Sequence, residues 1–223
     1  MSNQYDVIII GAGAAGMMCA IEAGKRRRKV LLVDHFKKIG EKIRISGGGR
    51  CNFTNLNTQS SKFLSQNPKF VKSALSQYTQ HDFINLINKY EIKFHEKKLG
   101  QLFCDHSAQQ IVEMLLKECE LANVTIKREF NIIEIDKNKN QYIVKTVDET
   151  YLSQSLIIAT GGLSVPKIGA TAFGYNIAKK FGLDVLETLP ALVPLTFNEK
   201  ILEMCKELTG LSVEAIVSLN KVL

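Results

Sequence analysis

The stretch YDVIIIGAGAAG, residues 5–16, joins a short apolar run to a glycine-rich turn. The run is rich in β-branched residues and stops at a glycine, which is typical of a strand buried in a parallel sheet. Small and apolar residues continue at helical spacing from Ala14 to about Gly24, and a second apolar run, 29–33, ends on Asp34. This order of strand, glycine turn, helix, strand and acid predicts a βαβ unit of a Rossmann-like α/β fold.

Each glycine of the turn has its own physical role in holding a dinucleotide. Gly11 permits the tight turn, Gly13 lets backbone N–H groups approach a pyrophosphate, and Gly16 lets helix and strand pack closely. The pyrophosphate is then expected at the helix N-terminus, where free N–H groups and the helix dipole favour negative charge. Asp34 can accept hydrogen bonds from both hydroxyls of an adenosine ribose. The unit therefore predicts a dinucleotide site, but it does not separate NAD from FAD.

Two later glycine segments bear on that choice. Residues 46–52, SGGGRCN, expose backbone N–H groups, and Arg50 adds a fixed positive charge. This composition suits the diphosphate and ribityl chain of a flavin, although a flexible surface loop is the alternative. Residues 159–162, ATGG, end another buried run, where ligands lie in open α/β sheets. That segment alone could be an ordinary strand-end turn, but together the glycine segments favour FAD.

These motifs resemble a family of bacterial FAD-dependent flavoproteins marked by Ile-Ser-Gly-Gly-Gly-Arg-Cys-Asn, which includes NAD(P)/FAD-dependent, aminoacetone-oxidase-like and BaiN-like oxidoreductases. The resemblance rests on residues 11–16 and 42–55 and on the Leu192-Val193-Pro194-Leu195 stretch. It also rests on 159–162 with Ser164, Pro166 and Gly169, and on Gly174-Tyr175. It implies an FAD-binding domain interrupted by a β-barrel-like inserted domain, and it implies that this chain holds the N-terminal part only.

The turn, the acid and the later glycine segments define the expected FAD site, without a predicted catalytic residue. His35 is expected either at the adenosine or as an exposed loop residue. The expected cofactor-binding residues are Gly11, Gly13, Ala14, Ala15, Gly16, Asp34, His35, Lys42, Ser46, Gly47, Gly48, Gly49, Arg50, Cys51, Asn52, Ile132, Ala159, Thr160, Gly161 and Gly162.

The rest of the chain predicts further helices and a β-meander. Apolar spacing predicts helices within 70–78, 83–90 and 111–119, the last after a capping box at Ser107 and Gln110. Strands are expected at 124–127, 132–136, 141–147 and 150–152, followed by a separate buried run at 156–160. A helix is expected over 171–181, capped by Thr171 and stopped by Gly182.

We expect two domains. Residues 1–190 would form an incomplete FAD-binding domain, with a helical excursion at about 56–122. Residues 191–223 would begin the β-rich inserted domain, with a helix-like stretch at 192–197 and a strand at 211–219, and would be truncated by the chain end.

Composition limits the class of protein. The net charge is +7, with a basic run at 25–29. We interpret this run as a solvated helix end, with a nucleic-acid patch as the alternative. The five cysteines form no Cys-x-x-Cys pair, which favours a reducing cytoplasm. No apolar run approaches the roughly 18 residues of a membrane span, and no signal peptide is expected.

Two chemical groupings have competing interpretations. His95, Cys104, Asp105 and His106 fit no standard zinc spacing, so we expect no metal site and attribute them to packing. Cys51 follows Arg50, which could lower the thiol pKa and allow a redox role. Packing beneath the cofactor is the favoured alternative, because no resolving cysteine is near in sequence.

The preferred hypothesis is an FAD-dependent oxidoreductase that passes hydride through flavin N5 to or from a small organic substrate. NAD(P)H is a candidate reductant. One alternative is a flavoprotein acting on tRNA or other nucleic acid, a disfavoured partner at this point. Another is an inactive truncated fragment.

Overall fold

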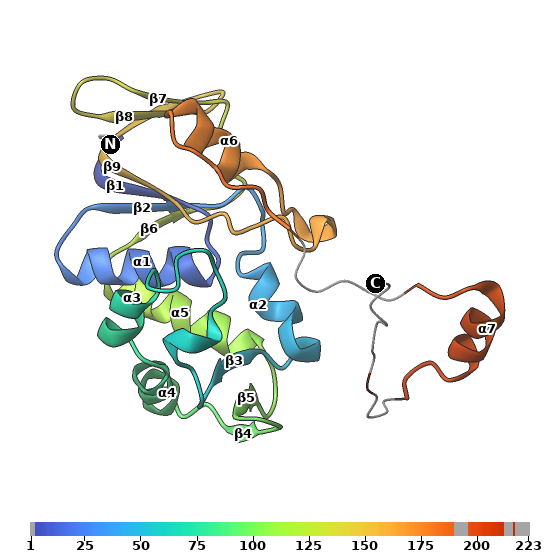
Figure 1. The fold of residues 1–223 in the computed structure, drawn as a ribbon. Helices are drawn as coiled ribbons and strands as arrows, with labels where there is room; N and C mark the ends of the chain where they lie inside the picture. Colours follow the sequence, from blue (N-terminus) through green and yellow to red (C-terminus); the bar gives the residue numbers. More distant parts are fainter. Residues whose placement is uncertain (1–2, 190–195, 212–215, 217–223) are drawn as a thin grey trace. The chain divides into compact units, whose positions relative to one another are not determined.

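The computed structural model describes residues 3–189, 196–211 and 216. The chain divides into two compact units, Met1–Asp184 and Val185–Leu223. The first unit is built on a six-stranded sheet whose strand order is β6-β2-β1-β9-β8-β7 (Figure 1). Its strands are β1 (Gln4–Ile10), β2 (Val30–Val33), β6 (Thr125–Lys127), β7 (Glu134–Lys137), β8 (Tyr142–Lys145) and β9 (Thr150–Ile158).

The sheet is mixed, and this confirms the predicted Rossmann-like α/β fold. β1 pairs in parallel with β2 and β9, and β2 pairs in parallel with β6. β7 and β8 add an antiparallel meander at the β9 side. The sequence predicted two separate strands where β9 is one. Its polar centre, Ser153 to Ser155, breaks the apolar pattern, but the backbone ladder with β1 continues from Tyr5↔Ser153 to Val7↔Ser155.

Alternation along β1 and β2 divides the core between the two faces of the sheet. Ile9 and Leu32 belong to one buried cluster, and Ile8 and Leu31 belong to the other. Successive side chains of a strand point to opposite faces, so each central strand contributes to both clusters. Helices α1 (Ala14–Lys25) and α5 (Gln109–Leu121) lie on one face of the sheet, and α6 (Phe173–Lys180) lies on the other (Figure 1).

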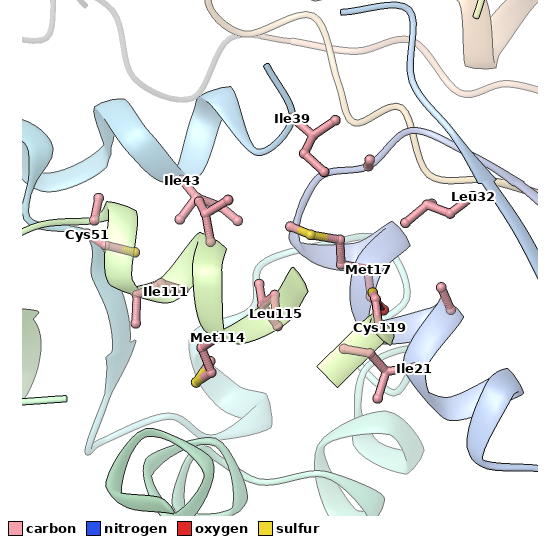
Figure 2. Close-up of a cluster of buried hydrophobic side chains, with 14 of the residues drawn as sticks. Met17, Ile21, Leu32, Ile39, Ile43, Cys51, Ile111, Met114, Leu115 and Cys119 are labelled. Atoms are coloured by element: carbon pink, nitrogen blue, oxygen red, sulfur yellow. Dashed lines mark hydrogen bonds between the residues drawn. The ribbon is translucent and has the colours of Figure 1, made fainter. Parts of the chain in front are cut away.

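The larger cluster joins three helices. Met17 and Ile21 of α1 belong to it, as do Ile111 and Leu115 of α5 and Ile43 of the short α2 (Glu41–Ile45) (Figure 2). Each buried aliphatic side chain of this size stabilises the fold by about 1.5–3 kcal/mol. The cluster therefore fixes α2 against α5, and with it the chain that leads into the glycine segment at 46–49.

The excursion between β2 and β6 contains a second, three-stranded sheet that the sequence analysis did not predict. Its strands are too short to show alternation. It has the order β3-β5-β4, with β3 (Asn52–Asn55), β4 (Phe94–Glu96) and β5 (Gln101–Cys104). The excursion also holds the single-turn helices η1 (Ser46–Gly49) and η2 (Ser60–Lys62), and the helices α3 (Lys72–Gln77) and α4 (Gln80–Lys89).

The helix caps correct two predictions and support a third. The cap expected from Thr171 is wrong, because Ala172 is the N-cap of α6 and no side chain caps it. The capping box expected at Ser107 and Gln110 is wrong, because Ala108 is the N-cap of α5 and no side chain caps it. A capping box forms instead at α4, between Thr79 and Asp82. Gly182 follows the end of α6 with a φ of 75°, as a C-terminal stop requires.

In the second unit the structure describes α7 (Glu199–Glu207), which is capped by the Asn198 side chain. The helix-like stretch expected at 192–197 and the strand expected at 211–219 lie mostly outside the described residues. None of the described helices is long and apolar enough to cross a membrane.

Candidate cofactor-binding site

A pocket of about 630 Å³ lies where β1, β2 and β9 end. Its wall includes Gly11 and Gly13 of the first glycine turn, Asp34 after β2, and Ala159 and Gly161 after β9. Cofactor sites commonly enclose about 300–1,000 Å³, so this volume is of the right order. The carboxyl ends of parallel strands are where α/β sheets bind ligands, and the pocket occupies that position.

The two glycine turns lie against each other. Gly11 has a φ of +106°, and a Cβ there would stand 2.5 Å from the Ala159 carbonyl oxygen. A Cβ on Gly16 would stand 1.8 Å from the Gly11 oxygen, so helix α1 reaches the strand end only because residue 16 is glycine. Gly13 differs, because a Cβ there would meet nothing within 4 Å. Gly13 therefore leaves open space at the pocket rather than filling a protein contact.

The N-terminus of α1 opens toward this pocket with its backbone donors available. Gly13 is the N-cap, no side chain caps the helix, and the first turn holds no acidic residue. Ala14 and Ala15 also line the pocket. A helix of 12 residues with uncapped N–H groups at a cavity favours an anionic group such as a pyrophosphate.

Asp34 braces the turn as well as lining the pocket. Its Oδ2 accepts a hydrogen bond from the Ala12 N–H at 2.8 Å, and its Oδ1 accepts one from the Phe36 N–H at 2.9 Å. A carboxylate has about four lone-pair positions, so both oxygens keep capacity for ribose hydroxyls.

Lys42 ties α2 to the second glycine turn. Its Nζ donates to the Gly162 carbonyl oxygen at 3.0 Å and to the Ser164 Oγ at 3.2 Å. The contact spans 120 residues of sequence and holds the segment after β9 beside the pocket. Gly161 has a φ of +74°, which glycine adopts at little cost.

The SGGGRCN segment divides between the pocket wall and the surface. Ser46, Cys51 and Asn52 line the pocket. The three glycines all have positive φ values, between 59° and 85°, and Arg50 is exposed. The segment therefore forms the single-turn helix η1 with its glycines in the left-handed region.

Most of the predicted cofactor-binding residues gather at this one cavity. Those that line it are Gly11, Gly13, Ala14, Ala15, Asp34, His35, Lys42, Ser46, Cys51, Asn52, Ile132, Ala159, Thr160 and Gly161. Those that do not are Gly16, which packs beneath the turn, and Gly47, Gly48, Gly49, Arg50 and Gly162.

The sequence analysis missed an aromatic part of the wall. Phe36, Phe130 and Phe173 line the pocket, as do Phe53 and Phe83 from the excursion. Aromatic residues inside a fold have the same pattern whether they face a ligand or the core, so sequence alone gave no signal for most of them. For Phe36 there was a signal, because it directly follows Asp34 and His35, which were both predicted to lie at the site.

The pKa of the Cys51 thiol is shifted in the direction opposite to the one considered for Arg50. Burial raises the Cys51 pKa, partly offset by a hydrogen bond with Ser46. Burial also raises the pKa of the neighbouring Cys104, to about 12. Cys51 therefore packs at the pocket as a small neutral side chain.

Of the four residues His95, Cys104, Asp105 and His106, two form a local hydrogen-bonded pair. His95 Nδ1 lies 2.7 Å from Asp105 Oδ1, and Cys104 is buried. Among the residues that the structure describes, no group of three or more His, Cys, Asp or Glu side chains is arranged to hold a metal ion.

These features identify the type of site. Two abutting glycine turns, an uncapped helix N-terminus, an acid after the second strand and an aromatic wall fit a dinucleotide such as FAD. A model of the family described as "HI0933-like protein Rossmann domain" matches residues 5–219. The chain belongs to this HI0933-like family.

Sequence and structure comparisons give relatives of this HI0933-like chain. It is 52% identical over 216 residues to the ribosomal RNA dihydrouridine synthase of Escherichia coli (strain K12), a match that covers 97% of the chain and 54% of the relative. It is 49% identical over 203 residues to the protein of the same name from Haemophilus influenzae, covering 89% of the chain and 51% of the relative. The chain thus spans about half the length of these curated relatives.

A solved structure supports the fold alone. The 3-ketosteroid-delta4-(5alpha)-dehydrogenase from Rhodococcus jostii RHA1 superposes with a TM-score of 0.52 at 13% sequence identity, over 72% of this chain and 46% of that one. The matches as a whole support the prediction of an FAD-dependent oxidoreductase built on a Rossmann-like domain.

The names of the two relatives overturn part of our sequence-based expectation. Both are named for ribosomal RNA and neither for a small molecule. The preferred hypothesis of a small organic substrate is therefore wrong, as is the low standing given to nucleic acid as a partner. The alternative hypothesis, a flavoprotein that acts on nucleic acid, agrees better with this finding.

Proposed function

We propose that this chain is the FAD-binding part of an enzyme that reduces uridine to dihydrouridine in ribosomal RNA. The observation that carries the proposal is the 52% identity, over 97% of the chain, to a protein named for that activity. The pocket adds chemical support, because reduction of a pyrimidine ring needs a hydride donor and the site fits a flavin dinucleotide.

We assign the cofactor's parts to residues of the pocket. The pyrophosphate would bind the N-terminus of α1 beside Gly13, and the adenosine ribose would bind Asp34. The SGGGRCN segment would serve as the family's signature, with Ser46 and Asn52 contacting the flavin half of the cofactor. Support comes from the uncapped helix and from the pocket positions of these side chains.

The chemistry needs one hydride and one proton. When bound and already reduced by a donor such as NAD(P)H, the flavin would supply the hydride at N5, and the C5=C6 bond of uracil would take up that hydride and a proton. The aromatic and aliphatic wall, including Phe53, Phe83 and Leu115, would exclude water from the reacting ring. NAD(P)H is the proposed reductant that restores the flavin, and stopped-flow bleaching with NADH or NADPH would show which is used.

We further propose limits for the two domains and a cellular location for the protein. Residues 1–190 would form the FAD domain and residues 191–223 the start of an inserted domain. Ribosomal RNA as substrate and cysteines that are all free favour the cytoplasm.

The experiment is deletion of the gene, followed by digestion of purified ribosomal RNA to nucleosides and mass spectrometry. We expect dihydrouridine to disappear from ribosomal RNA and to return when the full-length gene is supplied on a plasmid. Dihydrouridine in transfer RNA from the same cells is the internal control and should not change. Unaltered dihydrouridine in the ribosomal RNA of the deletion strain would refute the proposal.

A further inference from the structure

One stretch of the chain has an unusual charge pattern. Residues 42–81 contain no Asp or Glu, although the chain as a whole has 22 acidic residues. The same stretch carries six basic residues, namely Lys42, Arg44, Arg50, Lys62, Lys69 and Lys72. No acid within the segment offsets this charge; Arg44 pairs with Glu41, just before the segment, at 3.6 Å. The remaining positive charge could attract an anionic partner.

The basic run at 25–29, considered earlier as a nucleic-acid patch, is a weaker candidate. Lys25 pairs with Glu22 and Glu118, both at 3.5 Å, and Arg26 pairs with Glu22 at 2.8 Å. Acidic neighbours thus neutralise part of that run. By contrast, Lys62, Lys69 and Lys72 are exposed and form no ion pair with any described residue.

Exposed aromatic rings alternate with these lysines in residues 60–72, which we call the Lys–Phe segment. Phe63 follows Lys62 and is 44% exposed, and Phe70 follows Lys69 and is 78% exposed. Rings that face water next to lysines offer stacking surfaces beside phosphate-binding charges. Hydroxyl and amide side chains, which hydrogen-bond to ribose and base edges, make up eight of the eleven residues from 57 to 67.

The Lys–Phe segment also encloses a hollow of about 420 Å³. Phe63, Leu64 and Pro68 give it apolar walls, Ser60 and Ser65 give it hydroxyl groups, and Lys72 gives it a cation. A base stacked on Phe63 with its phosphate against Lys72 would use the apolar wall and the cation.

The segment is connected to the cofactor pocket at both ends. The strand before it, β3, supplies Asn52 and Phe53 to the pocket wall, and the helix after it, α4, supplies Phe83. RNA held on the Lys–Phe segment would therefore lie on the same excursion that borders the candidate FAD site.

We propose that the Lys–Phe segment, residues 60–72, is a docking surface for unpaired RNA, with lysines on the phosphates and phenylalanines stacked on the bases. The inference rests on the proposed function, in which ribosomal RNA is the substrate. Unpaired RNA fits better than a duplex, because an unpaired base can stack on a side chain and a uridine must leave its pair to be reduced.

The test measures the affinity of the flavin-loaded, full-length protein for protein-free ribosomal RNA from the deletion strain, at several salt concentrations. In the test variant, Lys62, Lys69 and Lys72 are each replaced by Gln. Single-stranded contacts contribute a salt slope of about 0.7 per phosphate, so the slope should fall by about 2 and affinity at 0.15 M salt by roughly 50-fold. The matched control replaces Lys137, Lys139 and Lys179, which are equally exposed on β7, the following turn and α6.

A single substitution tests the stacking component separately. Phe70→Ala should weaken RNA binding by about tenfold, and Phe70→Trp should retain it, because every base can stack on either ring. Phe70 is largely exposed, so neither change should alter the melting temperature.

The outcomes separate this inference from the function on which it rests. Tight RNA binding by wild type that is weakened equally by both triple variants, or by neither, would overturn the docking surface alone. A wild-type protein that neither binds ribosomal RNA nor forms dihydrouridine in it would overturn the proposed function. Loss of binding to anionic lipid vesicles with unchanged RNA affinity would assign the lysines to a membrane and contradict the inference.

Discussion

Gly13 and Gly16 lie three positions apart in the same turn, but glycine is needed at the two positions for different reasons. Gly16 is required by the protein itself, because any side chain there would enter the Gly11 carbonyl. Gly13 is required by nothing within the described fold, since its φ is −83° and its surroundings are open. A residue that the fold does not need, at the rim of the pocket, is explained by a ligand.

Alanine substitutions should therefore separate folding from binding. Gly16→Ala should lower the free energy of unfolding by about 3 kcal/mol or more, because backbone rather than a flexible side chain must move. Gly13→Ala should leave the unfolding free energy of the flavin-free protein within about 0.5 kcal/mol of wild type. It should nevertheless weaken FAD at least tenfold, as quenching of flavin fluorescence would measure. If Gly13→Ala bound FAD as tightly as wild type, the pyrophosphate would not lie at this turn.

Among the elements, three helices meet at one buried carboxylate. Glu118 of α5 is 3% exposed. Its Oε1 accepts hydrogen bonds from Lys89 Nζ and Tyr90 Oη, both at 2.7 Å, and Lys25 of α1 lies 3.5 Å from its Oε2. Burial raises the Glu118 pKa, but the Lys89 and Tyr90 hydrogen bonds outweigh it and the net pKa is lowered. The same burial and the bond to Glu118 raise the Tyr90 pKa to about 12.

This carboxylate should make stability depend on pH. A folded pKa below the ordinary 4.5 means that the stabilisation is present above pH 4.5 and is lost as pH falls through the folded value. Glu118→Gln should cost about 1–3 kcal/mol at pH 7, measured by urea unfolding, and the difference from wild type should shrink at acid pH. Glu120→Gln is the control, because its pair with Lys117 is exposed and should contribute under about 0.5 kcal/mol. Equal losses in the two variants would contradict this account.

Some helices and strands could be predicted from the sequence and others could not. The βαβ unit was predictable because β1 and β2 contain continuous apolar runs, as buried parallel strands do, and because a glycine turn and the helix α1 lie between them. The small sheet was not, because β3 and β4 are four and three residues long and their order is created by pairing with β5. The glycines and the acid of the pocket were predictable, because a tight turn and close approach of the backbone to a pyrophosphate require glycine, and an acid after the second strand is typical of a ribose site. Its aromatic wall was not, because packing against a ligand leaves the same pattern as packing against protein.

For the whole molecule, the fold does not identify the substrate, whereas the distribution of charge favours an anionic one. The Rossmann-like unit is shared by proteins as distant as a steroid dehydrogenase, so the fold alone does not choose a substrate. The excess of 29 basic over 22 acidic residues is locally concentrated in the acid-free stretch at 42–81, which borders the pocket. A pocket that fits FAD next to a basic excursion with exposed aromatic rings agrees with the proposed reduction of RNA.

The most direct measurement is a single turnover of the full-length protein without oxygen. The bound flavin is first reduced by light with EDTA as the electron donor, which bleaches it, and ribosomal RNA from the deletion strain is then added without nicotinamide cofactor. We predict that the yellow absorbance returns and that about one dihydrouridine forms per flavin reoxidised. Flavin that stays bleached while the RNA is bound, or a protein that carries no flavin, would contradict the account.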